Sequence, residues 1–203
     1  MARILRFIKV MLPFMLITFA LAIPVRRHRV KKLRQKGIES PLLREAAILC
    51  FVAFLAGLAA ATVVPRLELY EGSFRLALGQ MGGLNLIPFK VIPETVWQVT
   101  VNHNSDYFWI NFVGNIVMFL PIGFGLALLW NGWTAKKMAV TGLCVTLFIE
   151  LNQLWQKRGC DVDDLWLNLL GVMLGYLAFR IIERRMPYLP SHDRFPPSGR
   201  ATE

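Results

Sequence analysis

The sequence predicts an all-α integral membrane protein, a helical bundle of about five transmembrane helices in a single domain. Hydrophobic residues make up 55% of the 203 residues and charged residues only 18%, whereas soluble domains carry about 25% charge. The charges gather in short segments between uncharged runs. Several runs reach the length of about 20 residues that a helix needs to cross a bilayer. This pattern excludes a soluble enzyme, a disordered chain and a disulfide scaffold.

Five segments have the length and apolar composition of a transmembrane helix. The fourth carries one acid, Glu150, near its far end. The segment 66–106 is too polar and too rich in Pro and Gly to span, so we expect a re-entrant or interfacial loop there. Residues 1–186 then form one transmembrane domain, and the prolines within 187–203 predict a disordered cytoplasmic tail. In chain order, the segments are about Ile4–Val25, Ala46–Val64, Tyr107–Trp130, a run that starts at Met138, and about Asp164–Ile182.

The basic residues predict the orientation of the chain in the membrane. If residues 26–45, residues 131–137 and the segment from Arg180 onward share one side, that side holds 15 of the 23 Lys and Arg residues. Cytoplasmic loops carry such an excess. We therefore expect the N-terminus outside and the C-terminus inside. The basic run 26–36 is interpreted as a contact with anionic lipid headgroups and not as a nucleic-acid site.

The first segment has a second interpretation. Arg3, Arg6 and Lys9 precede its apolar run, and Ala20-Leu21-Ala22 follows, which is typical of a signal peptide. Cleavage there would leave the basic run outside, so we expect a retained helix. With three cations and Pro13, this helix could also lie partly in the membrane interface.

Polar side chains at membrane depth are costly, and in this sequence they gather at one level. In the third segment, Asn111 and Asn115 lie four residues apart, in the half that we place outside. In the fourth segment, Glu150 and Gln153 lie near the outer end. Three helices therefore direct polar groups toward one site open to the outer leaflet. In the fifth segment, five positions fall within about 80° on a helix: Asp161, Asp164, Asn168, Gly171 and Gly175.

Two further polar residues belong to this region. Asp163 is a candidate ligand-binding residue, but it falls off the shared helical face, and we expect it to tolerate Asn better than Asp161 or Asp164 does. Arg158, in the joint between the fourth and fifth segments, is a candidate donor to a phosphate or carboxylate. A structural interpretation also stays open, because acids can cap a helix and asparagines can link helices.

Glycines and prolines are expected to shape the bundle. Gly171 and Gly175 offer a small-xxx-small surface for close helix contact. Pro121 removes one helical hydrogen bond and should kink the third segment. Gly123 follows in the same segment and is a further structural candidate.

In the loop 66–106, Asn85 is a further candidate contact, and Pro88 and Pro93 prevent a continuous helix. A turn lying over the polar site and a plain surface loop are both consistent with this composition. His103 has no second histidine nearby, and two acids three residues apart are weak evidence for a metal. The sequence therefore assigns neither a metal nor a cofactor.

Three blocks of these residues resemble the VanZ-like family of bacterial membrane proteins, named for an accessory protein of teicoplanin resistance. The resemblance covers about residues 85–180, and the first two segments carry no signature. It implies a multi-pass protein of the bacterial cytoplasmic membrane. The blocks are NLIPFK at 85–90, NFVGNIVMFLPIG at 111–123, and ELNQ at 150–153 with RGCDVDDLWLNLLG at 158–171, continuing to Gly175 and Tyr176.

The resemblance implies a location in the cell envelope, but it does not imply a particular reaction. Three hypotheses about function therefore stay open. The first is a non-enzymatic protein that binds a lipid-linked or cell-wall-related group and is linked to teicoplanin resistance. The second is an intramembrane hydrolase or transferase that uses Glu150 with the pair Asp161 and Asp164. The third is a lipid or small-molecule transporter. Membrane lipids are the expected partners, and the oligomeric state is open. The candidate binding residues are Asn85, Asn111, Asn115, Gln153, Arg158, Asp163 and Asn168.

Overall fold

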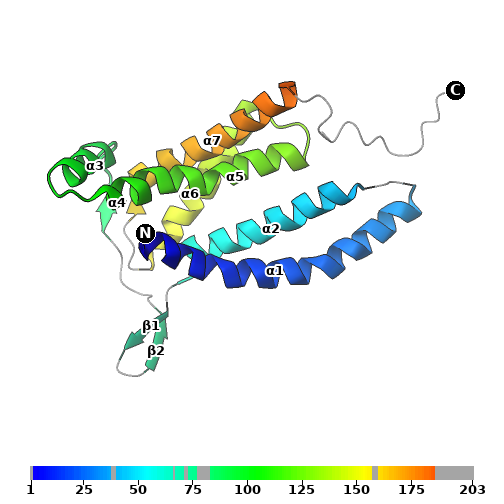
Figure 1. Ribbon diagram of the computed structural model, residues 1–203, viewed down its shortest axis with the longest axis horizontal. Helices are drawn as coiled ribbons and strands as arrows, with labels where there is room; N and C mark the ends of the chain where they lie inside the picture. The colour runs from blue at the N-terminus through cyan, green and yellow to red at the C-terminus, as the bar shows by residue number, and fades with distance from the viewer. Residues whose placement is uncertain are drawn as a thin grey trace.

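Long helices that run side by side dominate the computed structural model (Figure 1). It describes residues 2–37, 40–65, 67–70, 73–76, 83–156 and 160–185. The helices are α1 (Ala2–Gln35), α2 (Leu42–Thr62), α3 (Val91–Thr100), α4 (Ser105–Tyr107), η1 (Phe108–Val113), α5 (Gly114–Leu129), α6 (Ala135–Leu154) and α7 (Val162–Arg185). The strands are β1 (Leu67–Tyr70), β2 (Ser73–Leu76), β3 (Leu84–Asn85) and β4 (Cys160–Asp161).

The predicted class, an all-α membrane bundle, is confirmed. Within the described residues, four helices are long and apolar enough to cross a membrane. The fourth expected segment forms α6, which begins at Ala135 rather than at Met138 and is not among these four. Its ends lie beside Trp133 and Trp155, the residue type that favours membrane interfaces. The four helices are Phe7–Gln35, Leu42–Thr62, Ser105–Leu129 and Val162–Arg185.

Helices α5 and α7 pack backbone against backbone, because glycines line their contact. A Cβ on Gly171 would lie 2.3 Å from the carbonyl oxygen of Ile116, and one on Gly175 would lie 2.0 Å from that of Leu120. From the other side, a Cβ on Gly123 would lie 1.8 Å from the carbonyl oxygen of Val172. Only glycine fits such distances, so these three positions fix how closely the two helices approach.

The first two helices form a hairpin that lies beside the α5–α7 bundle (Figure 1). Gly57 of α2 lies against the side chain of Met15 of α1. Near the turn, the guanidinium of Arg26 donates two hydrogen bonds of 2.7 Å to Glu45, one to each carboxylate oxygen. The hairpin meets α5 where Phe51 packs over Gly125.

Helix α1 is longer than the apolar segment expected to end near Val25. The helix continues through the basic run to Gln35. Its 34 residues extend about 50 Å at about 1.5 Å per residue, whereas the hydrocarbon core of a bilayer is about 30 Å thick. Lys and Arg are good helix formers, so the helix leaves the membrane without ending.

The basic segments named above, which we call the basic joints, lie at one end of the bundle (Figure 1). They are the connection between α1 and α2, the connection between α5 and α6, and the end of α7. At the opposite end, short strands join segments that are distant in sequence. Strand β3 pairs in parallel with β4, which aligns Asn85 with Asp161. The antiparallel β1–β2 hairpin, which we did not predict, lies between α2 and β3 in the chain.

Candidate functional site

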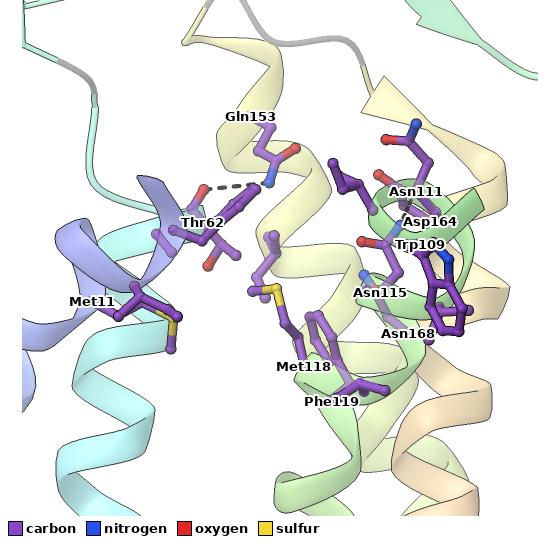
Figure 2. Close-up of a pocket in the computed structure, with 18 of the residues that line it drawn as sticks. Met11, Thr62, Trp109, Asn111, Asn115, Met118, Phe119, Gln153, Asp164 and Asn168 are labelled. Carbon is purple, nitrogen blue, oxygen red and sulfur yellow. Dashed lines mark hydrogen bonds between the residues drawn. The ribbon is translucent and has the colours of Figure 1, made fainter. Parts of the chain in front are cut away.

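A cavity of about 820 Å³ lies between the α1–α2 hairpin and the α5–α7 bundle (Figure 2). It is at the end opposite the basic joints (Figure 1). Its lining residues form two chemical sets, called here the apolar wall and the polar wall: α1 contributes only apolar side chains, α7 only polar ones, and η1 and α5 contribute to both. The apolar wall includes Phe7, Ile8 and Met11 of α1 together with Ile110, Val113, Val117 and Met118. The polar wall includes Asn111, Asn115, Glu150, Gln153, Asp164 and Asn168.

The polar wall is organised around Asp164 and the asparagines beside it. The side-chain amide of Asn115 donates to the Asp164 carboxylate, and the same Nδ2 also donates to the carbonyl of Asn111 at 3.1 Å. One turn further along α7, Asn168 is only 3% exposed. Its Oδ1 has no hydrogen-bond partner in the described part of the chain. This oxygen is therefore a buried, unsatisfied hydrogen-bond acceptor in the cavity wall.

A turn of π-helix, η1, presents the first of these asparagines to the cavity. The backbone N–H of Gly114 bonds to the carbonyl of Trp109, five residues back, where an α-helix would use the residue four back. Such wide turns occur frequently at functional sites. Trp109, Asn111 and Asn115 all line the cavity as a result (Figure 2). We did not predict η1, because nothing in the residue pattern distinguishes it from α-helix.

Glu150 links the cavity to the joint that precedes α7. Its side chain is 1% exposed, and Oε2 accepts a hydrogen bond of 3.1 Å from the backbone N–H of Asp161. Burial raises the pKa of the neighbouring Cys160 thiol, and the Glu150 carboxylate raises that pKa further. The thiol therefore stays protonated and can donate to Glu150. Across the cavity, Gln153 Nε2 donates to the carbonyl of Thr62 at 3.4 Å, which joins α6 to α2 (Figure 2).

Asp161 belongs to a second layer behind the cavity. Its Oδ1 accepts hydrogen bonds of 2.9 Å from Asn85 Nδ2 and from the backbone N–H of Asp163. The β3–β4 pairing supports the same contact. Asn85, a candidate binding residue, and Asp161, a candidate catalytic residue, therefore join the loop before α3 to the start of α7.

Asp163 fixes the same loop before α3 through its side-chain hydrogen bonds. It is 1% exposed and accepts three hydrogen bonds: from the N–H of Phe89 at 2.5 Å, from the N–H of Val91 at 2.6 Å and from Trp166 Nε1 at 2.7 Å. Phe89 adopts a φ of 64°, which is unfavourable for a bulky residue. Asp163 does point away from the cavity. Its three partners nevertheless lead us to expect that it tolerates Asn less well than Asp161 does.

The sequence that forms this site matches a known protein family. The family model described as VanZ/LLP1 matches residues 51–183. The chain belongs to the VanZ/LLP1 family. No curated protein and no solved structure matches it. The match begins within α2 and ends within α7, so it includes the whole polar wall, whereas α1 with its part of the apolar wall lies outside it.

Within this VanZ/LLP1 chain, the candidate residues fall into three groups. Asn111, Asn115, Glu150, Gln153, Asp164 and Asn168 meet in the cavity wall, whereas Asn85, Asp161 and Asp163 fix the loop and joint beside it. Arg158 lies outside the described residues. Among the residues that the structure describes, no three His, Cys, Asp or Glu side chains are placed to hold a metal ion.

Proposed function

We propose that this VanZ/LLP1 protein binds an amphiphilic ligand of the bacterial cell envelope, in the class of lipid-linked cell-wall precursors. The proposal is supported by the mixed lining of one cavity, to which α1 contributes only apolar side chains and α7 only polar ones. An amphiphile has the same division, so its head would contact α5, α6 and α7 while its chain would lie along α1. The cavity volume of about 820 Å³ lies in the range of about 300–1,000 Å³ that is typical of sites for drug-sized ligands.

The polar wall suits a head group that donates hydrogen bonds. Its charged members among the described residues are the acids Asp106, Glu150 and Asp164. The buried Asn168 Oδ1 is an acceptor without a partner among these residues, and such a group costs about 1–3 kcal/mol. A ligand hydroxyl, amide or ammonium group would remove that cost. The sugar and peptide parts of a cell-wall precursor carry such donors.

The apolar wall is open toward the lipid. Ile8 of α1 and Val117 of α5 line the cavity and are both exposed. Because these helices have the length and hydropathy of membrane spans, their exposed side chains meet acyl chains. A ligand could therefore bind through its head while its hydrocarbon chain stays in the bilayer.

In this proposal the cavity faces the outside of the cytoplasmic membrane, because the basic joints lie at the opposite end of the bundle. Teicoplanin binds the exposed end of cell-wall precursors on that side. A protein that holds such a precursor against the membrane would lower the access of the glycopeptide, which would account for the resistance linked to the family's namesake.

The test is the lipid that co-purifies with the protein, identified by mass spectrometry after gentle extraction. We expect one lipid-linked species to be enriched over the bulk membrane, and Asn168→Leu to lower its recovery about tenfold, since one buried hydrogen bond to the ligand is worth about 1.4 kcal/mol.

The matched control is Thr146→Val. Thr146 Oγ1 is also buried and has no partner among the described residues, but Thr146 does not line the cavity. Its variant should keep the wild-type recovery. A co-purified composition equal to that of the bulk membrane, or full retention in Asn168→Leu, would refute the proposal.

A second candidate function is intramembrane hydrolysis or transfer. It is favoured by one observation: the carboxyl groups of Glu150 and Asp164 come from different helices and both line the cavity, as a general acid and base require. Asp161, which we had paired with them, faces Asn85 instead. Turnover of a labelled lipid-linked precursor by purified wild-type protein, abolished in Glu150→Gln, would establish catalysis over simple binding.

A further inference from the structure

Helix α3 carries three separate stripes along its ten residues. Val91 and Thr95 are buried against the protein. A polar stripe follows the spacing i, i+4, i+8 through Lys90, Glu94 and Gln98, and an exposed apolar stripe follows i, i+4, i+7. The apolar stripe consists of Ile92, Val96 and Val99.

The directions of these stripes fit a helix that lies flat beside a bundle at a membrane surface. At 100° per residue, the apolar and polar stripes point about 170° apart, with the buried stripe between them. One side of α3 therefore faces the protein, and the two flanking sides face opposite environments. This is the arrangement of an interfacial helix, which has acyl chains on one side and water on the other.

The polar stripe is fully engaged with neighbouring polar groups. Lys90 Nζ lies 3.1 Å from the Glu94 carboxylate, and Tyr107 donates its hydroxyl to the same carboxylate at 2.8 Å. Asn102 donates to Gln98 at 3.2 Å. These contacts keep the polar side of α3 in a fixed orientation, so the apolar stripe on the other side is held outward.

The loop before α3 is apolar and exposed as well, and a buried carboxylate fixes its shape. Leu86, Ile87 and Phe89 are all exposed. Asp163 accepts from the N–H of Phe89, and the Phe89 ring packs on Trp166 with centroids 5.5 Å apart. These contacts fix the shape of the loop, so its apolar side chains stay exposed.

Tryptophans mark the same end of the bundle as a membrane interface. Trp97 of α3, Trp109 of η1 and Trp155 after α6 are each more than half exposed. All three lie near the cavity end, where Figure 1 shows α3 beyond the ends of the long helices. Trp is enriched where the hydrocarbon core meets the headgroups. The exposed apolar stripe of α3 lies at this same end of the bundle.

We propose that α3 and the loop 84–89 form an anchor that lies in the lipid interface at the mouth of the cavity. Ile92, Val96 and Val99 enter the acyl region, and Glu94 and Gln98 face water. The occupant of this surface is lipid and not a second copy of the chain. The anchor does not depend on which ligand the cavity binds.

The test uses a photoreactive benzoylphenylalanine at position 96 or, as the matched control, at position 98 of the full-length protein in phosphatidylethanolamine–phosphatidylglycerol vesicles. After irradiation, mass spectrometry should detect covalent lipid adducts at position 96 and several-fold fewer at position 98. Both positions lie on the same helix, and thermal midpoints equal to that of the wild type show that each variant is folded.

Two outcomes would overturn the anchor. Equal lipid labelling at positions 96 and 98 would mean that α3 does not lie flat with its apolar stripe toward the lipid. A chain-to-chain adduct at position 96 in place of lipid adducts would show that a second copy covers this surface. Because neither measurement involves the cavity, failure of the anchor would leave the proposed ligand binding standing, and the reverse also holds.

Discussion

Asp163→Asn should destabilise the protein more than the same change at Asp161, although the two carboxylates lie two residues apart, Asp161 in β4 and Asp163 in the first turn of α7. Asp163 Oδ1 accepts from Phe89 and Trp166, and Oδ2 accepts from Val91. An Asn side chain can serve the first two donors with its single oxygen, but its NH₂ group then meets the Val91 N–H. A donor facing a buried donor leaves both groups unsatisfied.

The magnitude follows from these contacts. A hydrogen bond to a charged group contributes about 1.5–3 kcal/mol, and a buried unsatisfied donor costs about 1–3 kcal/mol. The side chain is 1% exposed, so solvent compensates little of this. We expect a loss of about 3 kcal/mol in the free energy of unfolding, which for a chain of this size lowers the thermal midpoint by about 6–12 °C.

Asp161→Asn is the matched comparison. Both hydrogen bonds that Asp161 accepts through its side chain in the described structure end on Oδ1, so an Asn oxygen can keep both, and we expect a loss of about 1 kcal/mol. The assay is thermal unfolding in one detergent, with hydrogen exchange at the Phe89 and Val91 amides as a local probe. Equal midpoints for Asp163→Asn and wild type, with unchanged protection of those amides, would refute the role of Asp163 in fixing the loop before α3.

Three further predictions address the bundle, its orientation and its site. Gly171→Leu should lower the thermal midpoint more than Leu170→Ala, because any Cβ at 171 meets the α5 backbone and overpacking costs about 1–3 kcal/mol or more; equal midpoints for Gly171→Leu and wild type would contradict the contact. In intact cells, an impermeant thiol reagent should label a cysteine placed at position 75 and spare one at position 35, and the opposite result would invert the topology. Asp164→Asn, at matched membrane levels, should abolish any teicoplanin or envelope phenotype while the protein stays folded; a retained phenotype would remove Asp164 from the site.

The fold class was predictable because hydropathy acts locally. Uncharged runs of bilayer length leave few alternatives to a helix, and the elements expected from them are present. The boundaries were less predictable, as α1 shows. Charged residues show where a chain leaves the hydrocarbon core of the membrane. A helix, however, ends only where its backbone hydrogen bonds end. The basic run up to Gln35 consists largely of residues that favour the helical conformation, so α1 continues through it.

The parts that sequence reasoning missed depend on contacts between distant residues. The β3–β4 pairing brings Asn85 to Asp161 across 76 positions, and no local pattern records such a pairing. Pro93 was expected to prevent a continuous helix through the loop 66–106, and the short helix α3 that we did not predict has Pro93 in its first turn, where the missing N–H of proline would have had no partner in any case. The hydrogen-bond partners of Asp163 could not be predicted for the same reason. Helical spacing predicts the direction in which its side chain points, but not which residues lie in that direction.

Consecutive acids at the start of α7 therefore do two different things. Adjacent helical residues point about 100° apart, so Asp163 faces the loop before α3 and Asp164 faces the cavity. The backbone between them is continuous helix, which ties the position of the loop to the position of the cavity carboxylate. A change that frees the loop, such as Asp163→Asn, should consequently weaken ligand retention through the placement of Asp164 and Asn168, even though Asp163 does not line the cavity. If retention survives while the loop amides lose their protection from exchange, the two layers act independently, and only Asp164 and its neighbours belong to the site.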